Sequence, residues 1–283
     1  MPLPIYVSRN GALISPAQAT ISVFNTAIFG AYGVYESMEV VAGVPFALEA
    51  HLRRLTCSAA LLKLPLPADL ATFQRWIADV LAVNAAPRCT LRLFVVGGEN
   101  GNDSVAFIWP QAGHNFPRAF YLDGAPVITF EGHRNLPQAK SLNTLISYLA
   151  QRAARTVGVH EALLHHGGCL TEGSNSNLFA VVEGAVLTPP AEQVLSGVTR
   201  DLLLELADQD GVPIREALLP LAALSRWSEC FITSSSRHVM PVTLIDGRPV
   251  GDGRVGPLTR RLNALFEAYF TQTTGVRSDD RSC

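Results

Sequence analysis

The chain has 283 residues, of which 48% are hydrophobic and 16% are charged, and its formal net charge is −2 at pH 7. This balance favours one or two folded domains and excludes an intrinsically disordered chain. No basic or acidic block is present, which argues against binding to nucleic acid or to a membrane surface.

The cysteines are odd in number and widely spaced, and no C-x-x-C motif occurs among Cys57, Cys89, Cys169, Cys230 and Cys283. This pattern predicts a reducing compartment, no disulfide framework and no metal site. The N-terminal residues lack the charged and apolar regions of a signal peptide, and no apolar run reaches about 18 residues. We therefore expect a soluble cytoplasmic protein without a membrane span.

The N-terminal part of the chain predicts strands and two helices. Alternating apolar residues, rich in Val and Tyr, predict strands at 5–7, 12–14, 33–41, 44–47, 90–96 and 104–109. Helical periodicity predicts helices at 48–62 and 71–84. The polar segment 111–117 contains Gly and Pro and is the predicted linker between two domains.

The rest of the chain predicts shorter strands mixed with helices. The expected strands are 127–130, 161–165, 178–182, 186–188, 213–217, 229–233 and 242–245, and the expected helices are 142–156, 199–209, 219–225 and 258–269. Strands and helices do not alternate strictly, which favours an α+β fold over a doubly wound sheet. We expect domains at residues 1–115 and 116–271, followed by a disordered polar tail at 272–283.

Lysine is rare, since only Lys63 and Lys140 occur among 22 basic residues. Lys63 follows a predicted helix and can complement the helix dipole there. Lys140, in PQAKSLNTL, precedes a predicted helix that Ser141 or Asn143 could cap. A lysine at such a position is commonly a solvated surface residue, and the alternative is a desolvated amine that forms a Schiff base.

Three further polar stretches are candidates for binding a charged ligand. Glu172 lies in LTEGSNSNLF, where it could pair with a pyridinium nitrogen or simply be a turn acid. The stretch LSGVTRD begins a predicted helix, whose free N–H groups can bind phosphate. The stretch FITSSSRHVMPV places Arg237 and His238 directly after three serines, where they could face an anion. No G-x-S-x-G, P-loop or H-E-x-x-H motif is present.

The order of these pieces resembles the class IV aminotransferases, the fold-type IV enzymes that use pyridoxal 5'-phosphate. An arginine in HLRRL, a lysine in KSLN, TEGSNSNLF, GVTRD and TSSS follow one another between about Gly33 and Tyr269. The resemblance implies a two-domain α+β fold, with a small N-terminal α/β domain and a larger C-terminal α/β pseudo-barrel. It also implies a homodimer in which both subunits line each site.

The resemblance assigns the Schiff-base lysine to Lys140 and the acid facing the pyridinium nitrogen to Glu172. Tyr35 and Glu36 in GVYES match a pair that faces the site on a strand. The other predicted cofactor contacts are Arg54, Asn177, Leu195, Gly197, Val198, Thr199, Ser234 and Ser235. The predicted substrate contacts are Tyr35, Arg92, Ser236 and Arg237.

The resemblance implies a ping-pong transaminase that moves an amino group between an amino acid and a 2-keto acid. The segment Val95–Gly101 lacks the arginine of the ordinary D-amino-acid type, which favours apolar or branched L-amino acids. The turn FGAYGVYE is one residue longer than the family pattern, and Thr144 stands where branched-chain enzymes have a tyrosine. The alternatives are a lyase of the aminodeoxychorismate type and a D-amino-acid or (R)-amine transaminase.

Overall fold

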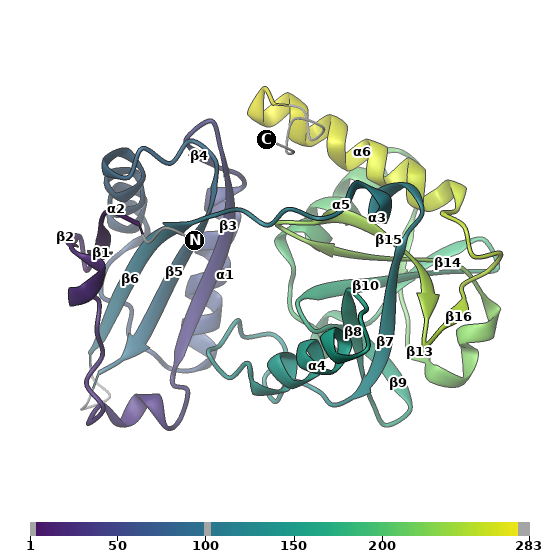
Figure 1. Cartoon of the computed structure of the whole chain (residues 1–283), viewed down its shortest axis with the longest axis horizontal. Helices are drawn as coiled ribbons and strands as arrows, with labels where there is room; N and C mark the ends of the chain where they lie inside the picture. The colour runs from purple at the N-terminus through teal and green to yellow at the C-terminus, as the bar shows by residue number, and fades with distance from the viewer. Residues whose placement is uncertain (1–3, 99–102, 277–283) are drawn as a thin grey trace. The chain divides into compact units, whose positions relative to one another are not determined.

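The computed structural model describes residues 4–98 and 103–276, and the chain packs as two compact units (Figure 1). Unit 1 contains residues 1–114 and the short segment Ala139–Asn143. Unit 2 contains Asn115–Gln138 and Thr144–Cys283. The segment that carries Lys140 therefore packs with the N-terminal unit, although the expected domain boundary placed it in the second domain.

Unit 1 consists of one antiparallel sheet with two helices on one face. The strand order is β2-β1-β6-β5-β3-β4. The strands are β1 (Val7–Arg9), β2 (Ala12–Ile14), β3 (Gly33–Val41), β4 (Val44–Pro45), β5 (Cys89–Gly97) and β6 (Ser104–Gln111). The helices are α1 (Leu48–Leu61) and α2 (Leu70–Val83), with short 3-10 turns at Pro16–Gln18 and Thr26–Ile28. Alternate residues of β3, including Val34 and Met38, are buried against the helices because successive side chains point to opposite faces.

Unit 2 is built on a ten-stranded sheet, part of which closes into a barrel. The strands are β7 (Ala125–Glu131), β8 (Glu161–His166), β9 (Cys169–Gly173), β10 (Ser176–Val182), β11 (Ala185–Thr188), β12 (Ile214–Glu216), β13 (Leu219–Pro220), β14 (Trp227–Ser234), β15 (His238–Ile245) and β16 (Arg248–Pro249). The order β10-β14-β15-β7-β8-β9 forms a ring because β9 also pairs with β10. Closure leaves these strands no free edge and fixes β9, β10 and β14 side by side.

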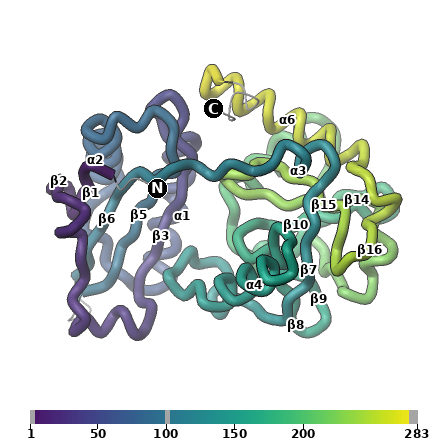
Figure 2. Tube along the Cα trace, in the orientation of Figure 1, coloured from purple at the N-terminus to yellow at the C-terminus, as the bar shows by residue number. Residues whose placement is uncertain are grey.

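Helices cover the outside of this barrel, and the tube in Figure 2 shows the chain ending in the long α6. The helices are α3 (Arg118–Leu122), α4 (Leu145–Thr156), α5 (Val198–Gln209) and α6 (Pro257–Thr274), with 3-10 turns at Ala191–Gln193 and Leu221–Arg226. Helix α4 packs on β7 and β8, while α5 and α6 contact each other and β14. Among the residues described, no helix is both long and apolar enough to span a membrane.

The structure confirms the α+β class and the pseudo-barrel, and it corrects several predicted elements. Strand β9 and the short helix α3 were not expected. Helix α4 begins at Leu145, not at 142, and its N-cap residue Thr144 makes no side-chain capping bond. The predicted tail was wrong at its start, because α6 continues to Thr274, beyond the buried Phe270. Residues 277–283 of that tail lie outside the described residues.

Candidate active site

The Lys140 segment runs along strand β3 of unit 1. The N–H of Tyr35 donates to the carbonyl of Lys140 at 2.9 Å, and the N–H of Leu142 donates to the carbonyl of Gly33 at 2.9 Å. The N–H of Lys140 donates to the Ser58 hydroxyl at 3.0 Å. A Cβ at Gly33 would lie 2.6 Å from Leu142 Cδ1, so only glycine allows this close approach. The backbone of Lys140 is thus fixed by α1 and β3, and not by a helix start.

The amine of Lys140 lies over the ring of Tyr35, with Nζ 4.5 Å from the ring centroid. The other lysine, Lys63, is exposed and lies just beyond the C-terminus of α1, as predicted. Lys140 is half-buried, which is the kind of partly desolvated position that a reactive amine requires.

The next residue of β3, Glu36, points to the opposite face and is completely buried. Arg54 Nε donates to Glu36 Oε1 at 2.8 Å, and Arg54 Nη2 donates to Oε2 at 2.7 Å. His51 Nδ1 lies 2.8 Å from Glu36 Oε2. Burial would raise the pKa of Glu36, but the charges and hydrogen bonds of Arg54 and His51 outweigh it and hold that pKa far below its usual value. Tyr35 and Glu36 therefore do not face one common side.

Arg92 of β5 lies on the strand face opposite the helices. It is half-buried, its Nη2 is 3.2 Å from the Gln111 side-chain amide, and its register partners are Ser37 and Trp109. Burial lowers the pKa of Arg92, and the nearby Tyr35 opposes that shift. A partly desolvated guanidinium on this face could bind a carboxylate, but the structure contains no substrate that tests this predicted role.

In unit 2, Glu172 lies on β9 and is buried. Its Oε2 accepts the N–H of Leu195 at 3.2 Å, and its Oε1 is 3.6 Å from Nη1 of Arg134. Glu172 faces Asn177 in the β9–β10 register, and Asn177 faces Thr233 in the β10–β14 register. A carboxylate, an amide and a hydroxyl therefore form a row across three adjacent strands.

Asn177 fixes the segment that precedes α5. Its Nδ2 donates to the carbonyl of Leu195 at 2.8 Å, and a Cβ at Gly197 would lie 1.9 Å from its Oδ1. Gly197 is the N-cap residue of α5 and makes no side-chain capping bond, and Val198 and Thr199 follow it as buried residues. The predicted caps Ser196 and Thr199 are thus not used, and Ser196 instead donates to Asp201 at 2.6 Å. The first N–H groups of α5 point outward from the helix end, as an anion site requires.

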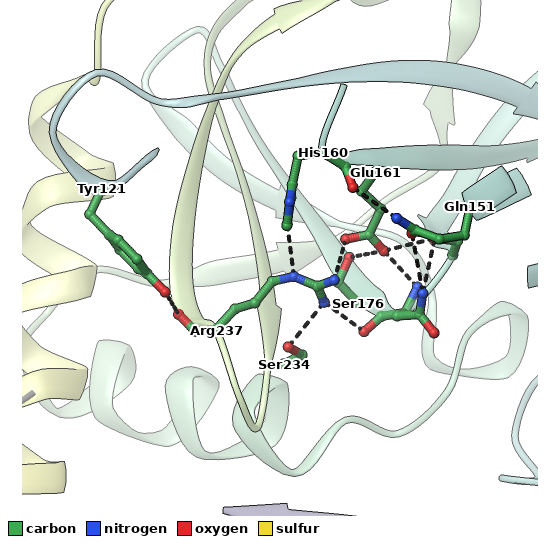
Figure 3. A network of polar contacts seen from close by, with 9 residues as sticks. Tyr121, Gln151, His160, Glu161, Ser176, Ser234 and Arg237 are labelled. Carbon is green, nitrogen blue, oxygen red and sulfur yellow. Dashed lines mark hydrogen bonds and ion pairs between the residues drawn. The ribbon is translucent and has the colours of Figure 1, made fainter. Parts of the chain in front are cut away.

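The serine stretch forms the turn between β14 and β15, and all three serines are half-buried. Arg237, which was predicted to contact substrate, is 7% exposed, and its guanidinium lies in an internal polar network (Figure 3). His238 is buried, lies 2.8 Å from Glu267 of α6 and has a left-handed φ of 58°. The sequence prediction that His238 could face an anion is therefore wrong.

These residues fit the cofactor that the sequence resemblance implies. Glu172 offers a buried carboxylate, Lys140 a partly desolvated amine, and the start of α5 a set of N–H donors without a side-chain cap. The buried hydroxyl of Thr233 has no hydrogen-bond partner within the described part of the chain. A buried polar atom of this kind is normally satisfied, which is consistent with a ligand that supplies the missing bond.

Sequence reasoning missed Arg134, Thr233 and Glu161. Arg134 precedes Lys140 by six residues in an irregular segment, and no periodicity marks its approach to Glu172. Thr233 could have been inferred only from the strand register. Glu161 begins a strand whose apolar residues conceal one completely buried carboxylate.

Comparison with known proteins places this geometry among related folds. Residues 33–245 match the family model described as amino-transferase class IV. A putative branched-chain-amino-acid aminotransferase of Methanocaldococcus jannaschii is 33% identical over 275 residues, which cover 93% of this chain and 96% of that protein. A D-alanine aminotransferase of Listeria monocytogenes is 32% identical over 278 residues, which cover 94% and 96%.

Two solved structures are similar over nearly the whole chain. The branched-chain amino acid aminotransferase of Escherichia coli has a TM-score of 0.86 at 26% identity, with coverage of 98% of this chain and 97% of that one. A second branched-chain amino acid aminotransferase, from T.th. and solved with pyridoxamine 5'-phosphate, has a TM-score of 0.87 at 27% identity, with coverage of 99% and 97%.

Proposed function

The chain belongs to the class IV aminotransferases, which depend on pyridoxal phosphate, and from this we propose that it transfers amino groups from apolar L-amino acids to 2-keto acids with Lys140 as the covalent anchor of the cofactor. The observation that carries the proposal is the partly desolvated amine of Lys140, whose backbone is fixed by Tyr35 and Ser58. An amine held in this way is positioned for nucleophilic attack on an aldehyde.

The residues divide the chemistry between them. Pyridoxal phosphate supplies an electron sink that lowers the cost of removing the proton from the substrate Cα. Lys140, once displaced by the substrate amine, is the base that takes this proton and returns it on the cofactor side. Glu172 holds a proton on the ring nitrogen through its charge, and Leu195 N–H and Arg134 keep its carboxylate in place. The N–H groups of Val198 and Thr199, with Arg54 and Ser235, are the proposed phosphate ligands.

The preferred substrate is inferred from the relatives and from the sequence. Relatives named for branched-chain amino acids favour an apolar side chain. The second candidate is a D-amino acid, which the D-alanine aminotransferase at 32% identity favours. The absence of an arginine at Val95–Gly101 argues against this second candidate. A panel of L- and D-amino acids with pyruvate and 2-oxoglutarate distinguishes them, and turnover without any keto acid would indicate a lyase instead.

A homodimer is also part of the proposal. Helix α4 exposes Leu145, Tyr148 and Leu149, which lie on one side of the helix at spacings of three and four residues. An apolar stripe of this kind is typical of a surface that a second subunit covers. Sedimentation of the full chain tests the dimer, and a monomer at micromolar concentration would contradict it. The predicted cytoplasmic location stays a prediction.

Replacement of Lys140 tests the central assignment. Lys140→Ala should abolish the colour of the bound cofactor and reduce turnover roughly a thousandfold or more, because no other amine can act as both nucleophile and base. Lys63→Ala is the matched control and should keep both the colour and the turnover. Loss of the colour in the Lys63 variant, with retention in the Lys140 variant, would overturn the assignment.

A further inference from the structure

One buried ion pair joins the two turns of unit 2 that carry predicted ligand contacts. Arg237 Nη2 lies 3.1 Å from Glu161 Oε2, and the two side chains are 8% and 0% exposed (Figure 3). Arg237 follows the serine turn directly, and Glu161 begins β8. A pair so completely buried is costly unless further hydrogen bonds complete it.

Glu161 holds the turn between β9 and β10, which follows Glu172 directly. Its Oε1 accepts the N–H of Asn175 at 2.6 Å, the Ser174 hydroxyl at 3.1 Å and the Ser176 hydroxyl at 3.2 Å. A Cβ at Gly173 would lie 2.8 Å from the same oxygen, so this turn closes tightly around the carboxylate. The position of the strand end that carries Glu172 is therefore linked to Glu161.

Arg237 holds the serine turn and the Asn175 peptide at the same time. Its Nη1 donates to the Asn175 carbonyl at 3.1 Å and to the Ser234 hydroxyl at 3.2 Å. Its backbone N–H donates to the Ser234 carbonyl at 3.2 Å. The peptide of Asn175 is thus bound at its N–H by Glu161 and at its carbonyl by Arg237.

Aromatic residues and a neutral histidine complete the surroundings of the guanidinium. Arg237 Nε donates to His160 Nε2 at 3.0 Å, and Arg237 Cζ lies 5.3 Å from the ring centroid of Phe116. Burial, together with the charge of Arg237, lowers the pKa of His160 to about 4, so Nε2 is an acceptor at neutral pH. Tyr121 donates to the carbonyl of Arg237 at 3.0 Å. All three guanidinium nitrogens have partners inside unit 2.

We infer that Arg237 is a positioning residue that acts with Glu161 to fix the serine turn relative to Glu172, and that it does not itself bind the substrate carboxylate. The inference rests on the proposed function. A pyridine ring with a phosphate arm is a compact ligand, so the acid at its ring nitrogen and the donors at its phosphate must stand at a set separation. A single ion pair that binds both turns sets that separation.

Binding to the cofactor-free full-length protein tests the inference through a phosphate-dependent readout. Dissociation constants for pyridoxal phosphate and for pyridoxal would be measured by equilibrium dialysis for the wild type, Arg237→Met, Arg237→Lys, Glu161→Gln and the double variant Glu161→Gln/Arg237→Met. Arg226→Met, which removes an exposed ion pair with Glu183 in the same unit, is the matched control. The double variant removes both buried charges, so it remains informative if a single variant folds poorly.

Each single variant should weaken pyridoxal phosphate by about tenfold or more, as expected for one misplaced hydrogen bond to a charged group, and change pyridoxal by less than about threefold. The double variant should be no worse than either single variant, because both act through one pair. Arg237→Lys should not restore the affinity, since an ammonium cannot bridge four partners.

Raised KM values for the amino donor or the keto acid in Arg237→Met, with an unchanged ratio of the two dissociation constants and no effect of Glu161→Gln, would overturn the inference. Arg237 would then be a direct ligand of the substrate. A wild type that binds pyridoxal as tightly as pyridoxal phosphate would overturn the proposed function as well, so the two failures are distinguishable.

Discussion

Each unit of the molecule contains a buried arginine–glutamate pair with a histidine beside it, and the two pairs differ in what completes them. In unit 1, Glu36 receives two hydrogen bonds from Arg54 and one contact from His51. In unit 2, Glu161 receives only one contact from Arg237, at 3.1 Å, and three from neutral donors of the β9–β10 turn.

The difference separates two ways of keeping a carboxylate charged in the interior. Glu36 depends on a neighbouring positive charge, because apart from Arg54 and His51 its described contact is the N–H of Ser37 at 3.3 Å. Glu161 shares its charge among a main-chain N–H and two hydroxyls, as a solvated ion would. The pair in unit 1 therefore orients an arginine side chain, whereas the pair in unit 2 orients two turns of backbone.

The largest expected effect is on stability, from removing Arg54. Arg54→Met leaves Glu36 buried without its main partner, which should lower the free energy of unfolding by about 3–5 kcal/mol. Urea unfolding at neutral pH measures the loss, and Arg54→Met/Glu36→Gln should recover part of it. A loss below about 1 kcal/mol would show that Glu36 does not depend on this guanidinium, and the contrast between the pairs would disappear.

Arg237→Met should destabilise the protein less, by about 2 kcal/mol, because the neutral donors around Glu161 remain in place. The same urea titration measures it, and the ratio of the two losses is the quantity of interest. Equal losses from Arg54→Met and Arg237→Met would mean that the hydroxyls of Ser174 and Ser176 contribute little to Glu161.

The histidine beside the second pair should make stability depend on pH. The folded pKa of His160 is about 4, below the usual value of about 6.5. The unfolded chain therefore binds the proton first, and stability falls as pH decreases from about 6.5 to about 4. The contribution is at most about 3 kcal/mol, and about 1–2 kcal/mol after allowance for the partial exposure of the ring.

The pH effect is separable from that of the other buried histidine. Burial also lowers the pKa of His51, so the wild type should show two contributions of the same sign. His160→Gln keeps an acceptor for Arg237 Nε and removes one titration, so unfolding from about pH 4 to about pH 6.5 should become less steep. An unchanged slope would assign the dependence to His51 or to the carboxylates.

Local pattern predicted most of this architecture, and partners distant in sequence account for what it did not predict. Strand β3 and helices α1 and α2 were predicted to within one residue, because their apolar periodicity is long and regular. Strand β9 was missed because its hydrogen bonds come from β8, β10 and β13. Lys140, Glu172 and the serine turn were selected by their order in the chain, whereas the inward orientation of Arg237 depends on Glu161, 76 residues away, and no spacing indicates it.

The smallest expected effect comes from the arginine next to Arg54 on the same helix. The sequence HLRRL predicted one arginine facing solvent and one pointing inward, and the side chain of Arg53 is 66% exposed whereas that of Arg54 is 9% exposed. Arg53 lies 3.6 Å from the exposed Glu49, an ion pair that water and salt screen almost completely. Arg53→Met should therefore change the free energy of unfolding by less than about 0.5 kcal/mol, in the same urea titration used for Arg54→Met. A loss as large as that of Arg54→Met would mean that the cost lies in the charge or the propensity of α1 as a whole, and that burial beside Glu36 is not what distinguishes the first pair.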